Sequence, residues 1–110
     1  MWIICTAIVL FGFTTIMGLY LSSLVLRNKK TVNLVIVIHG VCTITGFILL
    51  FTYYPESLKS IVSFSIATFF GLILLYQDIM GKKFSKWLCF VHAFFTIVGF
   101  VFLLMFASQL

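Results

Sequence analysis

Four long apolar runs constrain the fold of this chain more than any other feature. A helix needs about 20 mostly apolar residues to cross the hydrocarbon core of a bilayer. Of the 110 residues, 64% are hydrophobic and only 8% are charged, whereas a soluble domain is about 25% charged. The sequence therefore predicts an all-α integral membrane protein, a single transmembrane domain over residues 1–110. The predicted spans cover residues 2–26, 32–54, 58–77 and 86–108.

The connections between these runs are short, so consecutive helices should be antiparallel neighbours. The fold expected is an up-down-up-down four-helix bundle in contact with the lipid bilayer. We expect the first run to remain in the mature protein, because no basic segment precedes it and it is longer than the apolar core of a signal peptide.

The basic residues of the chain predict its orientation. The second connection has only Lys59, opposed by Glu56. By the positive-inside rule, connections one and three are cytoplasmic and both termini lie outside, and we expect a bacterial inner membrane. Because the cations cluster where helices leave the membrane, the net charge of +5 indicates topology and lipid contact rather than nucleic-acid binding. The clustered cations are Arg27, Lys29 and Lys30 in the first connection, and Lys82, Lys83 and Lys86 near the third.

The sequence also repeats itself. When it is shifted by 53 residues without a gap, residues 8–50 align with residues 61–103, and 15 of the 43 pairs are identical. The matches include the two histidines, His39 with His92. An internal repeat indicates a repeated structural unit. We therefore interpret the chain as two tandem helical hairpins, residues 1–53 and 54–110, with the second and fourth helices on one diagonal of the bundle.

The matched positions predict a shared layer near the middle of the membrane. Gly18 and His39 are equally distant from the tip of the first connection, and Gly71 and His92 from the tip of the third. At about 1.5 Å per residue, all four lie roughly 16 Å from these tips. An ionisable residue at that depth is costly and suggests a functional site.

The histidine pair predicts a haem site. For one isolated histidine, a neutral ring bonded to a carbonyl would be the preferred interpretation, but two at symmetric positions favour a shared ligand. With helix axes about 8–10 Å apart, the bundle diagonal is about 13 Å, which we take as too wide for two imidazoles to share a small ion. An iron porphyrin spans such a gap with one histidine on each face. We therefore predict one haem b per chain, with His39 and His92 as the axial iron ligands.

Small and aromatic residues complete the predicted cofactor site. Gly18 and Gly71 are expected to leave room for the porphyrin edges. Further outward, Phe11 and Phe64 with Gly46 and Gly99 are expected to form the wall at the far edge of the ring. Thr43 and Thr96 offer hydrogen bonds nearby. In the alternative interpretation these small residues only allow close helix packing, as in many transmembrane helices.

The arrangement of His39, His92, Gly18 and Gly71 resembles the haem-binding core of membrane b-type cytochromes. This group includes the cytochrome b561-like proteins and the haem-bearing halves of haem A synthase. The resemblance implies electron transfer by a low-spin haem, with a quinone or a redox protein as partner. It covers the bundle and these four residues. Because the chain has one histidine pair, it implies a single haem and no full relay across the membrane.

Other kinds of site find less support. A Cys2His2 metal site is unfavourable because Cys42 and Cys89 differ in depth by about 9 Å, whereas two thiolates on one zinc ion lie within about 4 Å. The two acids, Glu56 and Asp78, are at helix ends, unlike the membrane-embedded glutamate of small multidrug transporters. We predict no catalytic residues. Two alternatives stay open: a transporter or channel that uses His39 and His92 for a metal ion or proton, and a structural membrane subunit.

Overall fold

The structure, a computed structural model, describes residues 2–83 and 85–110. It confirms the all-α prediction, and all four helices are long and apolar enough to cross a membrane. The predicted spans agree with the helix bounds, except that the third helix continues two residues beyond the predicted end and the second is one residue shorter at each end. The helices are α1 (Trp2–Leu26), α2 (Asn33–Tyr53), α3 (Leu58–Ile79) and α4 (Lys86–Ser108).

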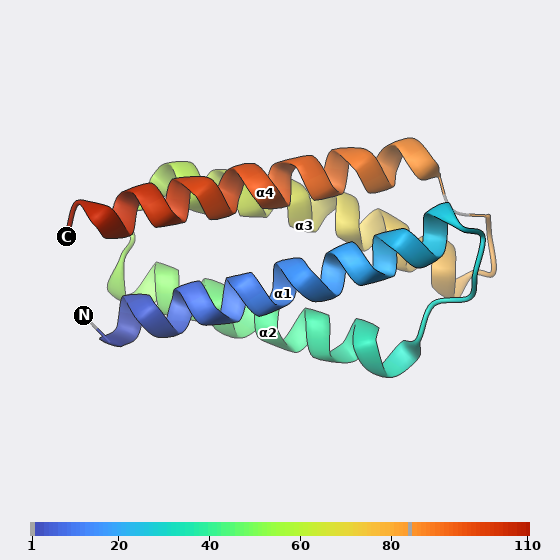
Figure 1. The fold of residues 1–110 in the computed structure, drawn as a ribbon, viewed down its shortest axis with the longest axis horizontal. Helices are drawn as coiled ribbons and strands as arrows, with labels where there is room; N and C mark the ends of the chain where they lie inside the picture. The colour runs from blue at the N-terminus through green and yellow to red at the C-terminus, as the bar shows by residue number, and fades with distance from the viewer. Residues whose placement is uncertain (1, 84) are drawn as a thin grey trace.

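The four helices lie side by side along one axis (Figure 1). α1 packs along both α2 and α4, and α3 packs along α4, whereas α2 and α3 barely touch. Both chain ends and the α2–α3 turn lie at one end of the molecule, and the α1–α2 and α3–α4 connections lie at the other (Figure 1). We call the half of the helices toward the chain ends the terminal half, and the other the connection half.

α1 and α3 end in the same way. Asn28 and Gly81 both adopt a positive φ, of 56° and 67°. The amide of the next residue, Lys29 or Lys82, donates to a carbonyl five residues back, at 2.8 Å and 2.9 Å. This is the Schellman arrangement, which satisfies carbonyl groups that the helix end leaves free. Asn28 and Gly81 are 53 residues apart, which is the shift of the sequence repeat.

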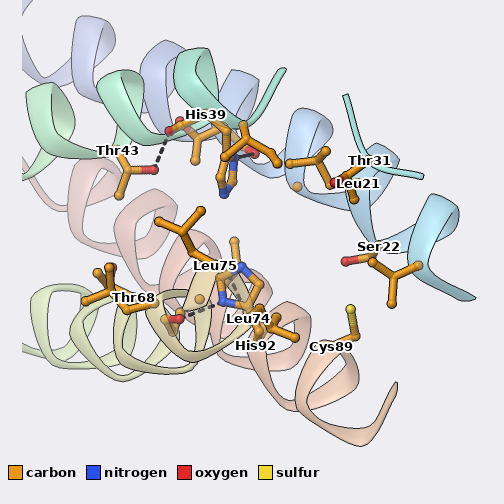
Figure 2. A pocket seen from close by; sticks show the side chains of 18 of the residues that line it. Leu21, Ser22, Thr31, His39, Thr43, Thr68, Leu74, Leu75, Cys89 and His92 are labelled. Carbon is orange, nitrogen blue, oxygen red and sulfur yellow. Dashed lines mark hydrogen bonds between the residues drawn. The ribbon is translucent and has the colours of Figure 1, made fainter. Parts of the chain in front are cut away.

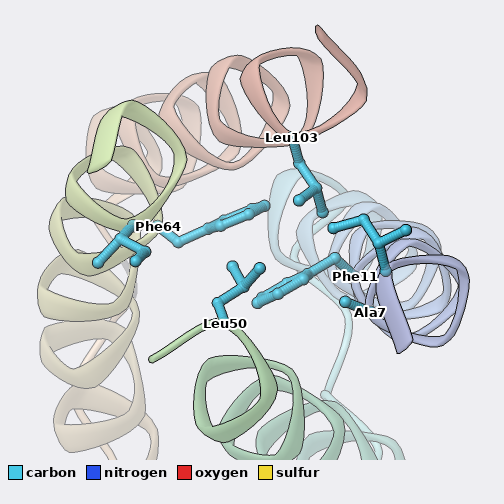
Figure 3. Packing of buried hydrophobic residues seen from close by; sticks show 7 residues of the cluster. Ala7, Phe11, Leu50, Phe64 and Leu103 are labelled. Carbon is cyan, nitrogen blue, oxygen red and sulfur yellow. The ribbon is translucent and has the colours of Figure 1, made fainter. Parts of the chain in front are cut away.

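The terminal half holds the main hydrophobic core. The rings of Phe11 and Phe64 stack there in parallel, with centroids 4.1 Å apart and planes 6° apart. Both rings are almost completely buried at the centre of the four helices (Figure 3). The hydroxyl of Ser60 donates to the carbonyl of Gly99 at 2.9 Å and ties α3 to α4. The core cluster comprises Ile4, Ala7, Phe11, Leu50, Ile61, Phe64 and Leu103.

The connection half is packed less tightly. Among the residues of α2, only Gly46 and Leu50 are buried, and both belong to the terminal half. The hydroxyl of Thr31, in the first connection, donates to the carboxylate of Asp78, near the end of α3, at 3.1 Å. Large apolar side chains such as Val37 and Leu72 are exposed on the outside, which suits contact with lipid rather than water.

Candidate functional site

The structure brings the two histidines together. Their ring centroids are 6.3 Å apart and the ring planes are at 76°. Figure 2 shows the rings of His39, on α2, and His92, on α4, projecting into one cavity from opposite walls. The two residues are 53 positions apart in sequence, so the shared layer predicted from counting along the helices is present in the structure.

A backbone carbonyl of the neighbouring helix orients each imidazole. His39 Nδ1 lies 3.0 Å from the Thr14 carbonyl oxygen on α1, and His92 Nδ1 lies 2.6 Å from that of Ala67 on α3. A carbonyl only accepts hydrogen bonds, so Nδ1 carries the proton in each neutral ring. Nε2 is then a free lone-pair donor. This is the arrangement that orients histidine ligands in metal sites.

The glycines of the predicted layer lie against the histidine rings. A Cβ atom on Gly18 would lie 3.0 Å from His39 Cε1, and one on Gly71 would lie 2.9 Å from His92 Cε1. The space beside each glycine is therefore filled by an imidazole of the same hairpin. A porphyrin edge at this position stays a prediction; in the structure each ring leans toward the neighbouring helix whose carbonyl it binds.

The second predicted layer forms one end of the cavity. A Cβ on Gly46 would lie 2.8 Å from the Phe11 ring, and one on Gly99 would lie 2.9 Å from the Phe64 ring. These glycines let the two phenyl rings approach the opposite helix and stack. Both rings line the histidine cavity, so Phe11 and Phe64 close it toward the terminal half.

The threonines around the histidines fall into two groups. The hydroxyls of Thr43 and Thr96 donate to the carbonyls of His39 and His92 in their own helices, at 2.8 Å and 2.9 Å. Thr14 differs: its buried hydroxyl has no hydrogen-bond partner in the described part of the chain. The sequence places Thr14 near the histidine layer but gives no signal that its carbonyl holds His39 and its hydroxyl is free.

The histidine cavity is lined by residues from all four helices and has a volume of about 190 Å³. It extends from the Phe11–Phe64 pair to Thr31 and Asp78 at the connection end. Most of its lining is apolar, as in typical sites for organic ligands. Cys89 contributes to the wall opposite Ser22 (Figure 2), so Asp78 and Cys89 join the site although the sequence analysis assigned neither to it.

The spacing of the rings suits a metal held between them. Imidazole nitrogen binds a metal at about 2 Å, so two rings on opposite sides of one metal have centres roughly 6 Å apart. The observed separation is 6.3 Å. The sequence-based argument that the histidines are too far apart to share a small ion is therefore wrong, because the rings lean inward from their helix axes.

The donor set fits haem better than a bare ion. Within residues 2–83 and 85–110, no three His, Cys, Asp or Glu side chains are placed to share a metal ion. A bare divalent zinc ion typically takes about four ligands, whereas a porphyrin supplies four nitrogens and needs only two axial ligands from the protein. The cavity exceeds the roughly 150 Å³ of an apolar cavity that binds benzene. A porphyrin is larger than benzene, so it also needs the gap that α2 and α3 leave.

Comparison with protein-family models, curated proteins and solved structures finds no match to this chain.

Proposed function

We propose that this chain is a small membrane cytochrome b that holds one haem b between His39 and His92. The observation that carries the proposal is the geometry of the two imidazoles: rings 6.3 Å apart with their planes at 76°, each with Nδ1 on a backbone carbonyl and Nε2 free. Such a pair supplies both axial ligands of a low-spin haem. The haem would supply one-electron chemistry, and the protein would act alone or as the haem subunit of a redox complex.

The residues around the rings have separable roles in this proposal. His39 and His92 bind the iron, and the carbonyls of Thr14 and Ala67 fix the orientation and tautomer of each imidazole. Phe11 and Phe64 exclude water from the terminal side of the site. A quinone or a redox protein is the proposed electron partner, because the chain itself holds no second histidine pair.

The proposed architecture is an up-down-up-down bundle of two tandem hairpins, each of which provides one histidine. Contacts at positions 53 residues apart support it: His39 with Thr14 corresponds to His92 with Ala67. Likewise, the contact of Gly46 with Phe11 corresponds to that of Gly99 with Phe64. The two hairpins would be related by an axis along the membrane normal.

We also propose that the connection end is cytoplasmic, because six of the seven basic residues lie there. A reporter fused after Leu110 should then be extracytoplasmic, and one inserted after Asn28 should be cytoplasmic. The reverse labelling would place the connection end of the cavity outside the cell and overturn this orientation.

A visible spectrum tests the proposed function. The purified protein, produced with an adequate haem supply, should show a sharp Soret band that shifts on addition of dithionite, with α and β bands in the reduced form. Haem extraction should give one haem b per chain. A colourless protein that also fails to bind added haemin would refute the proposal.

A metal-ion site is the second candidate, and the ring spacing is the observation that favours it. The observed 6.3 Å between the ring centroids is close to the spacing of two imidazoles on one ion, and Asp78 at the connection end of the cavity would attract a cation. Elemental analysis separates the two: bound metal other than iron, with no porphyrin, would support an ion site. A protein with neither metal nor haem would fit a structural subunit.

A further inference from the structure

One wall of the histidine cavity is sparsely packed. α1 and α4 pack against each other, and each hairpin packs internally, but α2 and α3 barely touch. This gap in the packing borders the cavity in the connection half, away from the turn that joins α2 and α3 at the other end (Figure 1). Ile36 on α2 and Leu75 on α3 line the cavity on either side of this gap. We call the gap the α2–α3 window.

Side chains close both ends of the cavity. Toward the terminal half, the stacked rings of Phe11 and Phe64 fill the centre of the bundle. Toward the connections, Thr31 donates to Asp78 across the cavity mouth, next to a group of buried side chains. This group comprises Leu24, Val25, Leu88 and Cys89.

The outer surfaces of α2 and α3 are apolar. Val37 and Val41 on α2, and Phe69 and Leu72 on α3, are all more than half exposed. Both helices are apolar enough to cross a membrane. In a bilayer, the window therefore faces hydrocarbon, where a water-soluble ligand has no access and an apolar one dissolves readily.

We propose that the α2–α3 window is a lateral entrance through which the site takes a flat, apolar, membrane-dissolved ligand from the bilayer. This proposal rests on the proposed function, in which that ligand is haem. The cavity of about 190 Å³ has to widen for a tetrapyrrole, and the sparsely packed seam is the wall that can move. The connection half of α2 moves away from α3, while the terminal half of α2 stays anchored by Gly46 and Leu50.

Cross-linking tests the entrance. In a background without native cysteines (Cys5, Cys42 and Cys89 replaced by Ala), Ile36→Cys and Leu75→Cys are bridged by a short bis-maleimide across the window. The control bridge joins Leu19→Cys on α1 to Ala93→Cys on α4, two residues that line a small cleft on the opposite seam.

The apoprotein is bridged first and then mixed with haemin in lipid nanodiscs, and the Soret band follows uptake. Bridging the window should slow uptake by about tenfold or more, and the control bridge should leave the rate within about twofold. Bridging after loading should leave the haem in place and slow its transfer to apomyoglobin. Equal uptake rates with and without the window bridge would overturn the proposal.

A second measurement needs no haem. In nanodiscs, nitroxide labels at the middle of lipid chains should broaden the imidazole Cε1–H signals of His39 and His92 in the apoprotein. A water-soluble nitroxide should not. The reverse pattern would show that the cavity opens to water and would overturn the entrance. A parent protein that binds no haem would refute the proposed function, and the lipid measurement would still decide the entrance.

Discussion

The terminal and connection halves of the bundle use the same four helices in different ways. In the terminal half, Phe11 and Phe64 stack at 4.1 Å, and each fits against a glycine of the opposite helix in its hairpin. In the connection half, His39 and His92 also lie beside glycines, but a cavity of about 190 Å³ remains between them. The comparison indicates that the terminal half stabilises the fold and the connection half holds the site.

Truncation of a stacked phenylalanine should give the largest loss of stability. Phe11→Ala or Phe64→Ala removes a buried ring from the packed layer at the terminal end of the cavity, so the free energy of unfolding should fall by about 3–5 kcal/mol. Denaturant titration of the apoprotein in detergent measures this. Phe69→Ala, at a ring that is 61% exposed, is the control. Similar losses in both variants would contradict the division into two halves.

Alanine substitutions at Gly46 and Gly18 should distinguish the two halves, with losses of stability smaller than those of the phenylalanine variants. Gly46→Ala places a methyl group 2.8 Å from Phe11, a buried ring that is stacked on Phe64, so unfolding should become easier by about 1–3 kcal/mol. Gly18→Ala meets His39 at 3.0 Å, a ring that borders the cavity and can shift. Its apoprotein should keep its stability within about 0.5 kcal/mol but bind haem about tenfold more weakly.

Gly40→Ala is the matched control, because a Cβ there would meet nothing within 4 Å. It should change neither the stability nor the haem affinity. If Gly18→Ala took up haem like the parent, the contact between Gly18 and the imidazole would not matter for binding.

Removal of the free hydroxyl of Thr14 should have a smaller effect on the free energy of unfolding, and it should stabilise the protein instead of destabilising it. A buried hydroxyl without a partner is unfavourable, so Thr14→Val should raise the free energy of unfolding of the apoprotein by about 1 kcal/mol. Thr96→Val is the comparison, because that hydroxyl donates to the His92 carbonyl and its loss should not stabilise. Equal destabilisation in both variants would indicate that Thr14 is satisfied, for example by water.

The hydrogen bond between Thr31 and Asp78 should have the smallest effect. It is a single hydrogen bond between the first connection and the end of α3, so a double-mutant cycle with Thr31→Val and Asp78→Asn should give a coupling energy of about 0.5 kcal/mol. Thermal unfolding of the four apoproteins measures it. A coupling several times larger would mean that the connection end contributes to stability as strongly as the phenylalanine layer.

The sequence was sufficient for the features that depend on position along a helix. Hydropathy located all four helices, and counting from the connections placed Gly18 at the depth of His39 and Gly71 at the depth of His92. The sequence could not give the direction in which a side chain leans, because that direction depends on hydrogen bonds between helices. The sequence therefore did not predict that the imidazoles lie against the two glycines, because each ring turns toward a backbone carbonyl that the sequence does not identify.

Two further features could not be predicted from the sequence, for similar reasons. Thr14 aligns with Ala67 in the repeat, so the unpartnered hydroxyl of Thr14 is a departure from the repeat rather than part of it. The α2–α3 window depends on how far two helices diverge, which follows from packing in the whole bundle. The sequences of α2 and α3 are equally compatible with two helices that pack against each other along their whole length.

Ligation by both imidazoles is the central claim, and the visible and electron paramagnetic resonance spectra of single histidine variants test it most directly. The account predicts that His39→Ala and His92→Ala each lose the low-spin six-coordinate spectrum, leaving apoprotein or a five-coordinate haem that binds carbon monoxide. Cys42→Ser and Cys89→Ser should keep the parent spectrum. A His39→Ala or His92→Ala variant with an unchanged low-spin spectrum would contradict it.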